Sequence, residues 1–231
     1  MIHERVLELI APLHRKYRMQ KCDLFFETFH PRPSDSMLDV GGGAGITGEF
    51  GALYRFFAEV HVVNLCPQKF DREQRRNVRF LIADGCSLPF PDRSFDWVFS
   101  NAVIEHVGRR ERQKQFAGEI QRVARQGFFV ATPNRNFPVD PHTLLPFYQF
   151  LSPRLQKRVC RFSPGYWREY EPLNLLSGSD LRNLFPGSDV RKMGMAALPN
   201  NLVAFRRLPP DQDPTVTPDR EDCVHAAGPV S

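Results

Sequence analysis

The 231-residue sequence lacks the features that mark several specialised classes of protein. No apolar run approaches the ~18 residues of a membrane-spanning helix. The N-terminal stretch, which includes His3, Glu4 and Arg5, contains no apolar core like that of a secretory signal. The five cysteines are scattered, and none forms a Cys-x-x-Cys pair. We therefore expect no membrane span, no zinc site and no disulfide framework, and we predict a cytoplasmic protein.

The sequence also lacks a strong charge imbalance. Its 31 Lys and Arg residues, against 26 Asp and Glu residues, give a net charge of +5 at pH 7. The basic residues gather in short clusters, at 72–76 and 109–114, which are typical of solvated helix faces. We therefore expect no nucleic-acid partner. No group of Asp and His residues has the spacing of metal ligands, so we also predict no metal dependence.

What the sequence does contain is a glycine cluster directly after a short apolar run. The run from Met37 to Val40 includes Asp39, and four glycines fill the five positions 41–45, apart from Ala44. Residues 46–57 are then apolar enough for a helix. Backbone N–H groups in such a strand–turn–helix unit can bind a nucleotide, because glycine lets the backbone approach closely. The stretch reads Asp-x-Gly-x-Gly-x-Gly, a variant of the dinucleotide-binding pattern, and a plain turn is the simpler alternative.

Short apolar segments alternate with segments that suit helices or loops. The predicted strands span residues 37–40, 59–65, 78–83, 95–100, 128–132, 190–195 and 202–206, and the clearest helix spans 110–124. The first five strands are apolar along almost their whole length. This pattern predicts an α/β fold, with a Rossmann-like parallel sheet that helices cover on both faces.

The N-terminal segment, residues 1–35, has the pattern of helices. Residues 2–18 suit an amphipathic helix whose apolar side includes Val6, Leu9 and Leu13. Pro12 would interrupt it, because a proline inside a helix removes a hydrogen bond. A second, short helix is predicted at 21–29.

The main domain is predicted at residues 36–207, and it is interrupted by a segment of different composition. Residues 134–187 are rich in proline and aromatic residues, and we predict a helical cap inserted there, after the fifth strand. Its short helices are expected near 144–151 and 153–161, and a serine, Ser177 or Ser179, would begin a later one. Residues 208–231 contain little to bury, and we predict a disordered tail.

Polar or small residues stand at most of the predicted strand ends. These ends are Asp39 to Gly45, Asn64 and Leu65, Asp84 and Gly85, Ser100 and Asn101, and Thr132 to Asn134. In open α/β sheets, ligands bind beyond the carboxyl ends of the strands. If these positions served only the core, apolar residues would be expected there. The joint pattern of polar and small residues therefore predicts a binding site.

At these residues the chain resembles the class I S-adenosylmethionine-dependent methyltransferases. The resemblance covers about residues 35–135, and four segments carry it: Leu38 to Gly45, Ala83 to Phe90, Ser94 to Val98, and Val103 to Val107. It implies a seven-stranded sheet whose last strand runs antiparallel. It also implies that S-adenosylmethionine binds across the first two strand ends.

The resemblance further implies the role of each cofactor residue. Asp39, with the backbone of Gly41 and Gly43, would face the methionine part of the cofactor, and Gly45 belongs to the same turn. Asp84 would accept a hydrogen bond from the adenine amino group, with a backbone N–H supplied by Gly85 or Cys86. Asn101 would lie near the methionine part and the methyl group, and Asn64 and Leu65 would lie near the ribose.

Asn64 departs from the pattern of the family, which most often has Asp or Glu at this position. An amide oxygen can accept a hydrogen bond from one ribose hydroxyl, but without a charge the contact is weaker. This departure keeps one alternative open: a non-catalytic cofactor-binding or scaffold protein with the same fold.

Two histidines are candidates for the base that an alcohol acceptor would need. His106 follows the fourth strand, and His142 follows the fifth, where Asp140 would orient it. Each could equally be a structural residue. The predicted activity is O-methylation of a small molecule or a glycan unit, in which the protein aligns the acceptor and excludes water.

Two other enzyme classes fit the sequence less well. An NAD(P)-dependent oxidoreductase would need a hydride-transfer site such as Tyr-x-x-x-Lys, and none follows the fourth strand. Nucleic-acid base methylation is also disfavoured. Asn101-Ala102-Val103-Ile104 stands where Asn-Pro-Pro-Tyr or Asp-Pro-Pro-Tyr would be expected.

Overall fold

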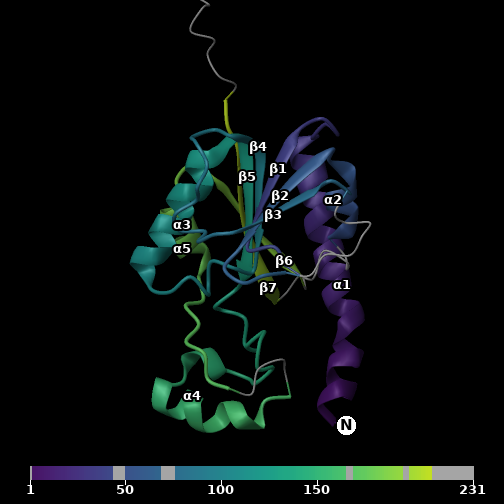
Figure 1. Ribbon diagram of the computed structural model, residues 1–231. Coiled ribbons are helices and arrows are strands. Elements are labelled where there is room, and N and C mark those ends of the chain that lie inside the picture. The colour runs from purple at the N-terminus through teal and green to yellow at the C-terminus, as the bar shows by residue number, and fades with distance from the viewer. Residues whose placement is uncertain (1, 44–49, 69–75, 165–168, 195–197, 210–231) are drawn as a thin grey trace, which may run out of the picture.

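One seven-stranded sheet organises the described part of the chain, which in this computed structural model comprises residues 2–43, 50–68, 76–164, 169–194 and 198–209 (Figure 1). The strands are β1 (Ser36–Val40), β2 (Glu59–Asn64), β3 (Val78–Ile82), β4 (Phe95–Asn101), β5 (Ala124–Pro133), β6 (Asp189–Gly194) and β7 (Pro199–Arg207). Their order across the sheet is β3-β2-β1-β4-β5-β7-β6. Neighbouring strands from β3 to β5 pair in parallel, and β7 pairs antiparallel with β5 and β6. The predicted sheet, including its antiparallel last strand, is confirmed.

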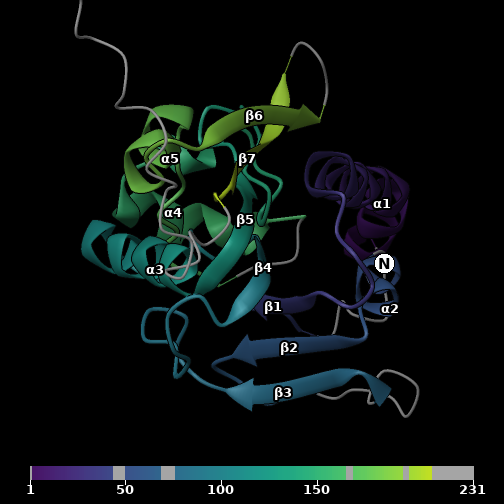
Figure 2. The same ribbon diagram turned by 90° about the horizontal axis from the view of Figure 1, so that it is seen from above.

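The central strands β1, β4 and β5 are apolar because both faces of the sheet are covered there. Successive residues of a strand point to opposite faces. Accordingly, Leu38 and Val98 join the core on one face, whereas Met37 and Phe99 join the core on the other. Helices α1 (Ile2–Phe29) and α2 (Gly51–Phe56) lie over one face, and α3 (Arg110–Val123) and α5 (Gly178–Leu184) lie over the other (Figure 2).

Aromatic side chains fix the C-terminal half of α1 against the sheet. Phe25 is fully buried, and its ring lies edge-on to those of Phe29, Trp97, Phe99 and Phe129, with centroid separations from 5.0 to 6.3 Å. Edge-to-face pairs at this separation are favourable beyond the area that they bury. The position of α1 matters for the site described below, because residues one and two turns before Phe25 reach the carboxyl edge of the sheet.

The predicted break in this helix is wrong. α1 runs without interruption from Ile2 to Phe29, with Pro12 inside it. The residues around Pro12 are exposed, so water can satisfy the carbonyl that loses its partner at the proline. The expected burial of the apolar side also fails in this half: Leu9 is 80% exposed, and Leu13 is exposed as well.

The segment between β5 and α5 forms a cap beyond the carboxyl edge of the sheet, as expected (Figure 1). It contains α4 (Pro153–Val159) and the short 3-10 turns η3 (Tyr148–Phe150) and η4 (Cys160–Phe162). The helix expected near 144–151 is reduced to η3. Pro146 supplies no N–H, and Leu144 and Phe147 have positive φ angles of 59° and 56° that end any helix.

Helix α5 begins as the sequence indicates. The Ser177 side chain accepts a hydrogen bond from the amide of Asp180, and the Asp180 carboxylate accepts from the amide of Ser177. This capping box satisfies two amides that the first turn would otherwise leave unpaired. No helix among the described residues is long and apolar enough to cross a bilayer.

Candidate active site

Two adjoining pockets lie at the carboxyl edge of the sheet. The first is lined by residues that follow β1 to β4, among them Gly41, Asn64, Leu65, Asp84, Gly85, His106 and Arg112. The second lies toward α1 and α2 and is lined by Arg18, Asp39, Gly41, Gly42, Gly43, Phe50, Tyr54, Phe99 and Asn101. Gly41 lines both pockets, so they are two parts of one cleft.

The structure therefore brings together the predicted cofactor residues, with two exceptions. Gly45 lies outside the described residues. Cys86 is buried in the core, and its amide donates to Oδ1 of Asp84 at 2.9 Å. The backbone N–H that we expected Cys86 to offer to adenine is thus already bonded, which leaves Gly85 as the candidate donor. That the other residues contact a cofactor stays a prediction.

The glycine turn follows β1 because side chains would not fit there. Gly41 has a φ of 87°, and a Cβ on it would overlap the side chain of Val103. A Cβ on Gly42 would overlap the carboxylate of Asp39. The amide of Gly41 donates to the carbonyl of Val63 at 2.7 Å, which ties the turn to β2. The result is a stretch of bare backbone open to a ligand.

Asn64 supports this turn from the end of β2. Its Nδ2 donates to the carbonyl oxygens of Gly42 at 2.9 Å and Gly41 at 3.2 Å, and its Oδ1 accepts from the amide of Cys66 at 3.1 Å. A carboxylate could not donate to those carbonyls and would repel them. The structure therefore gives a reason for Asn at a position where the family most often has Asp or Glu.

Asp39 is a buried carboxylate at the second pocket. It is 5% exposed, and Oδ2 accepts a hydrogen bond from the Tyr54 hydroxyl. Burial raises the pKa of Asp39 to about 7, against the opposing effect of the Tyr54 hydrogen bond. A cation bound beside Asp39 would favour its ionised form, and the ammonium of a bound methionine moiety is such a cation.

Two cationic residues of α1 reach the site, and sequence reasoning missed both. Arg18 lines the second pocket, where it can pair with an anionic group such as a ligand carboxylate. The Nζ atom of Lys21 donates to Oδ1 of Asn101 at 2.8 Å, and burial lowers the pKa of Lys21 to about 8. One signal was available: Lys21 stands in a four-residue series with Tyr17 and Phe25 on the buried side of α1.

Asp84 is held in place before any ligand binds. Its Oδ2 pairs with Nη2 of Arg112 at 2.6 Å, and this contact, with the amide of Cys86, keeps the pKa of Asp84 below its usual range. The carboxylate is about one-third exposed, so it can still accept a further hydrogen bond. Behind it, a Cβ on Gly85 would press on Phe116 and Val40, which explains the glycine.

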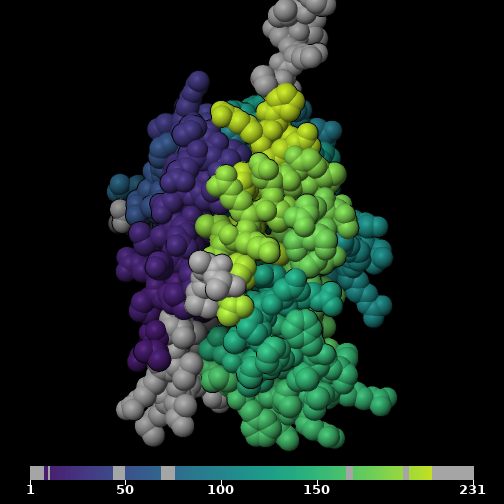
Figure 3. All heavy atoms as spheres, turned by 180° about the vertical axis from the view of Figure 1, so that it is seen from behind, coloured from purple at the N-terminus to yellow at the C-terminus, as the bar shows by residue number. Residues whose placement is uncertain are grey.

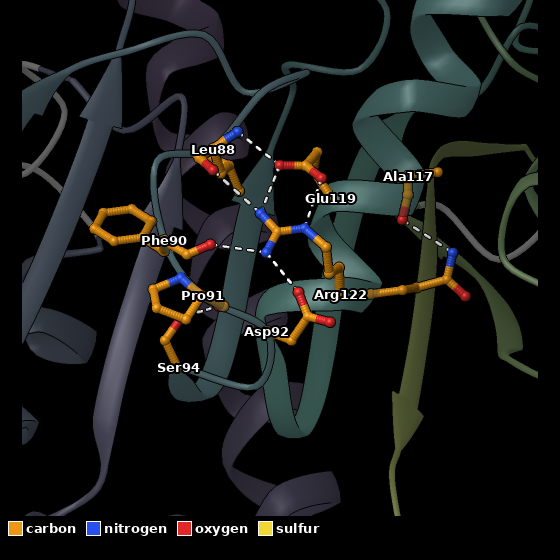
Figure 4. A network of polar contacts seen from close by, with 9 residues as sticks. Leu88, Phe90, Pro91, Asp92, Ser94, Ala117, Glu119 and Arg122 are labelled. Carbon is orange, nitrogen blue, oxygen red and sulfur yellow. Dashed lines mark hydrogen bonds and ion pairs between the residues drawn. The ribbon is translucent and has the colours of Figure 1, made fainter.

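Arg122 anchors the loop that follows Asp84 to α3 (Figure 4). Its guanidinium donates to the carbonyls of Phe90 and Leu88 and pairs with Asp92 and Glu119, at distances from 2.7 to 3.1 Å. Glu119 also accepts from the amide of Leu88 at 2.6 Å. The Leu-Pro-Phe-Pro-Asp run at 88–92 therefore has a structural role: its contacts with α3 fix the loop that follows Asp84.

His106 lies between two carboxylates. Its Nε2 is 3.8 Å from Oε1 of Glu105, and its Nδ1 is 3.5 Å from Oε1 of Glu171. Glu105 is fully buried, burial raises its pKa, and Oε2 accepts from the Thr132 hydroxyl at 2.9 Å. An imidazole held between two carboxylates has the geometry of an oriented general base.

His142 lies beside His106, with the two ring centroids 5.1 Å apart. Burial lowers the pKa of His142 to about 4, so its imidazole is neutral and a weak base. Oδ1 of Asp140 accepts from the amides of His142 and Thr143 and from the Thr143 hydroxyl, so Asp140 organises the turn that carries His142. That Asp140 also orients the imidazole stays a prediction.

Glu105, His106 and His142 form a group that a linear reading could not find. Their ligand atoms lie within 4.8 Å of one another, close enough to hold a metal ion after small side-chain movements. Buried Lys21 already supplies positive charge to Glu105. The spacing of residues along the sequence therefore does not reveal this group. The lack of metal dependence stays a prediction.

A third pocket adjoins the second at Asn101. Its lining includes His14, Tyr17, Arg18 and Lys21 of α1, His142 of the cap, and Asn200 and Asn201 of β7. None of the described residues that line it carries a carboxylate. It adjoins the predicted cofactor cleft at Asn101, and His142 lines it as well. It is therefore the candidate site for an acceptor molecule.

Comparison with known proteins finds a family model that matches the central part of the chain. Residues 38–131 match the family model described as a methyltransferase domain. A malonyl-[acyl-carrier protein] O-methyltransferase of Halorhodospira halophila is 42% identical over 82 residues, which are 33% of this chain and 26% of that protein. A phosphoethanolamine N-methyltransferase of Caenorhabditis elegans is 29% identical over 87 residues, 35% of this chain and 20% of that protein.

The fold is also that of solved structures at low sequence identity. The [4+2]-cyclase SpnF matches with a TM-score of 0.56 and 14% identity, over 90% of this chain and 95% of that one. A cyclase among the matches shows that the fold alone does not specify the reaction. The curated relatives are matched over about a quarter of their length, so their activities do not transfer as a whole.

A variant of Asn64 tests its role in supporting the glycine turn. Asn64→Asp should weaken binding of S-adenosylhomocysteine by ~1–3 kcal/mol, because the carboxylate cannot donate to the two carbonyls. Asn64→Ala, which removes the donor without adding a charge, should fall between this variant and the natural protein. Isothermal titration measures both. Tighter binding by the Asp variant would show that position 64 serves the ribose instead.

The pH dependence of ligand binding tests Asp39. Because the pKa of Asp39 is about 7 and an ammonium prefers the ionised form, affinity for S-adenosylhomocysteine should rise with pH. The expected increase from pH 6 to pH 7.5 is about fivefold to tenfold. The Asp39→Asn variant should lose this increase, and any remaining pH dependence of its affinity should come from titration of the ligand. Identical pH profiles for the two proteins would contradict a titrating Asp39.

Proposed function

We propose that this chain, whose residues 38–131 form a class I S-adenosylmethionine-dependent methyltransferase domain, methylates an oxygen atom of a small molecule or glycan unit. One observation supports this most directly. A cleft with a bare glycine turn, a buried carboxylate and a cationic side chain adjoins, at Asn101, a separate polar pocket that can hold the acceptor.

The residues present fit the methyl donor of this family. Asp39 can pair with the ammonium of its methionine part, and Arg18 can pair with the carboxylate. The first pocket has apolar Leu65 and the ionised carboxylate of Asp84 for the nucleoside. When bound, S-adenosylmethionine supplies an electrophilic methyl group for in-line displacement.

The protein's own task is then to hold the acceptor and take up its proton. The third pocket would orient the hydroxyl toward Asn101, and Lys21 fixes the Asn101 side chain from behind. His106 lines the first pocket, and its ring lies 5.1 Å from that of His142, which lines the third pocket. His106 is the better candidate for the base, since burial keeps His142 neutral and Glu105 and Glu171 flank His106. An acceptor that fills the third pocket would displace water from it.

A non-catalytic protein of the same fold remains the second candidate function. Asn64 is the residue that suggested it, because it lacks the charge that the family usually offers to the ribose. The hydrogen bonds from Asn64 to the glycine turn weaken this argument, since they give the amide a role in building the cofactor site. N-methylation is the nearest enzymatic alternative, as the name of one relative illustrates.

Binding and transfer together test the proposal. The chain should bind both S-adenosylmethionine and S-adenosylhomocysteine in isothermal titration, and it should transfer labelled methyl to hydroxyl-bearing acceptors in a panel of small molecules and sugars. Asp84→Ala should weaken binding by ~1–3 kcal/mol through the loss of an acceptor. No heat from either ligand would refute the proposal. Binding without transfer to any acceptor would favour the non-catalytic candidate.

A pair of matched histidine variants tests the base. His106→Gln should lower kcat by roughly 10²–10⁴-fold with little change in KM, because general-base catalysis acts on the chemical step. His142→Gln should lower kcat by less than about tenfold, since a neutral, weakly basic imidazole contributes little to proton uptake. Affinity for S-adenosylhomocysteine is the folding control for both. The opposite ranking of the two variants would assign the base to His142.

A further inference from the structure

One segment of the cap carries basic residues and no acidic ones. Between Pro141 and Arg168 the sequence contains no Asp or Glu, whereas Arg154, Lys157, Arg158 and Arg161 fall within eight positions. All four side chains are exposed on α4 and η4. Elsewhere the chain mixes charges of both signs, so this segment forms a local positive surface on a protein of modest net charge.

The same part of the cap also exposes large apolar side chains. Phe162 is 70% exposed and Phe147 is 60% exposed, and Phe150 and Leu155 are exposed as well. Single exposed apolar residues are ordinary, but several aromatic residues gathered among basic ones mark an interaction surface. The guanidinium of Arg161 lies over the ring of Phe162, 5.0 Å from its centroid, so the two types of side chain are interleaved. We call these four basic and four apolar side chains the cap face.

The N-terminal half of α1 lies at the same end of the molecule. Figure 1 shows the cap and the first turns of α1 beyond the carboxyl edge of the sheet, and Figure 3 shows the cap at this end from the opposite side. Leu9 and Leu13 are exposed there, and the next residue, His14, lines the acceptor pocket. One end of the molecule therefore combines apolar side chains, positive charge and the approach to the acceptor pocket.

We propose that this end docks onto the surface of an anionic lipid bilayer, with the cap face as the contact. Phe and Leu side chains would enter the boundary between head groups and acyl chains, while Arg and Lys pair with anionic head groups. Two features favour lipid over other occupants. A second copy would bring two positive faces together, which repel each other. The exposed Leu9, Leu13 and Leu155 are aliphatic: they suit acyl chains and offer no stacking surface to nucleic-acid bases, whereas the Phe rings suit either partner.

Docking in this orientation would direct the acceptor pocket toward molecules held in the bilayer. The inference does not depend on methyl transfer, because vesicle binding can be measured without any acceptor. A chain that binds vesicles but transfers no methyl would contradict only the proposed function. A chain that transfers methyl but ignores vesicles would contradict only the docking.

Co-sedimentation with vesicles tests the docking on the full chain. It should bind phosphatidylcholine vesicles that contain phosphatidylglycerol at least about tenfold more tightly than pure phosphatidylcholine vesicles, and added salt should weaken the binding. Arg154→Glu/Lys157→Glu/Arg158→Glu should reduce the affinity about a hundredfold or more. Phe150→Ser/Phe162→Ser should reduce it without changing the net charge.

Two controls keep the result specific to the cap face. Arg182→Glu/Lys192→Glu/Arg207→Glu makes the same change of net charge at exposed residues outside the cap, and it should keep most of the vesicle affinity. Affinity for S-adenosylhomocysteine and the melting temperature should match the natural protein in every variant. Equal losses in the cap variant and this control would overturn the proposal, as would the absence of vesicle binding.

Two further outcomes would assign the cap face to another partner. Tighter binding of RNA than of anionic vesicles, lost in the cap charge variant, would overturn the lipid assignment. So would a dimer in solution that the Phe150→Ser/Phe162→Ser variant dissociates.

Discussion

Burial of the sheet on both faces is the constraint on which the rest of this structure depends. Helices α1 and α2 cover one face and α3 and α5 cover the other, so the strands present apolar side chains in both directions. In the central strands β1, β4 and β5, polar side chains are therefore few and stand mostly near the strand ends. The carboxyl ends of parallel strands meet at one edge, and Asp39, Asn64, Asp84 and Asn101 all belong to that edge.

The site is assembled from charges that the fold holds close together. Asp39 and Glu105 are buried carboxylates, and the nearest compensation comes from Tyr54, from Lys21 and from His106. Buried charges without partners are costly, so each of these contacts restricts where a ligand's charges can be placed. Arg18 and Asp39 at the second pocket favour a ligand that carries both an anion and a cation, as an amino acid moiety does.

The cap and α1 extend this edge outward. α1 contributes twice: its aromatic C-terminal half packs against the sheet, and its middle supplies His14, Arg18 and Lys21 to the pockets. The helix continues through Pro12, where Glu8, Leu9 and residues 11–13 are exposed to water. The cap adds His142 to the same site while it leaves aromatic and basic residues on the outside.

The sequence by itself determined the strands and the start of the glycine turn. Apolar runs with polar ends are local patterns, and residues 38–131 carry enough of them to match the model of a methyltransferase domain. Only the tertiary structure decided which residues that are distant in the sequence contact each other. Helix packing brings Lys21 to Asn101, 80 positions away, and the cap brings His142 to His106. Asn64, which lacks the charge usual at its position, donates hydrogen bonds that support the glycine turn. No local pattern records these contacts, because the energies that select them arise from burial in the folded core.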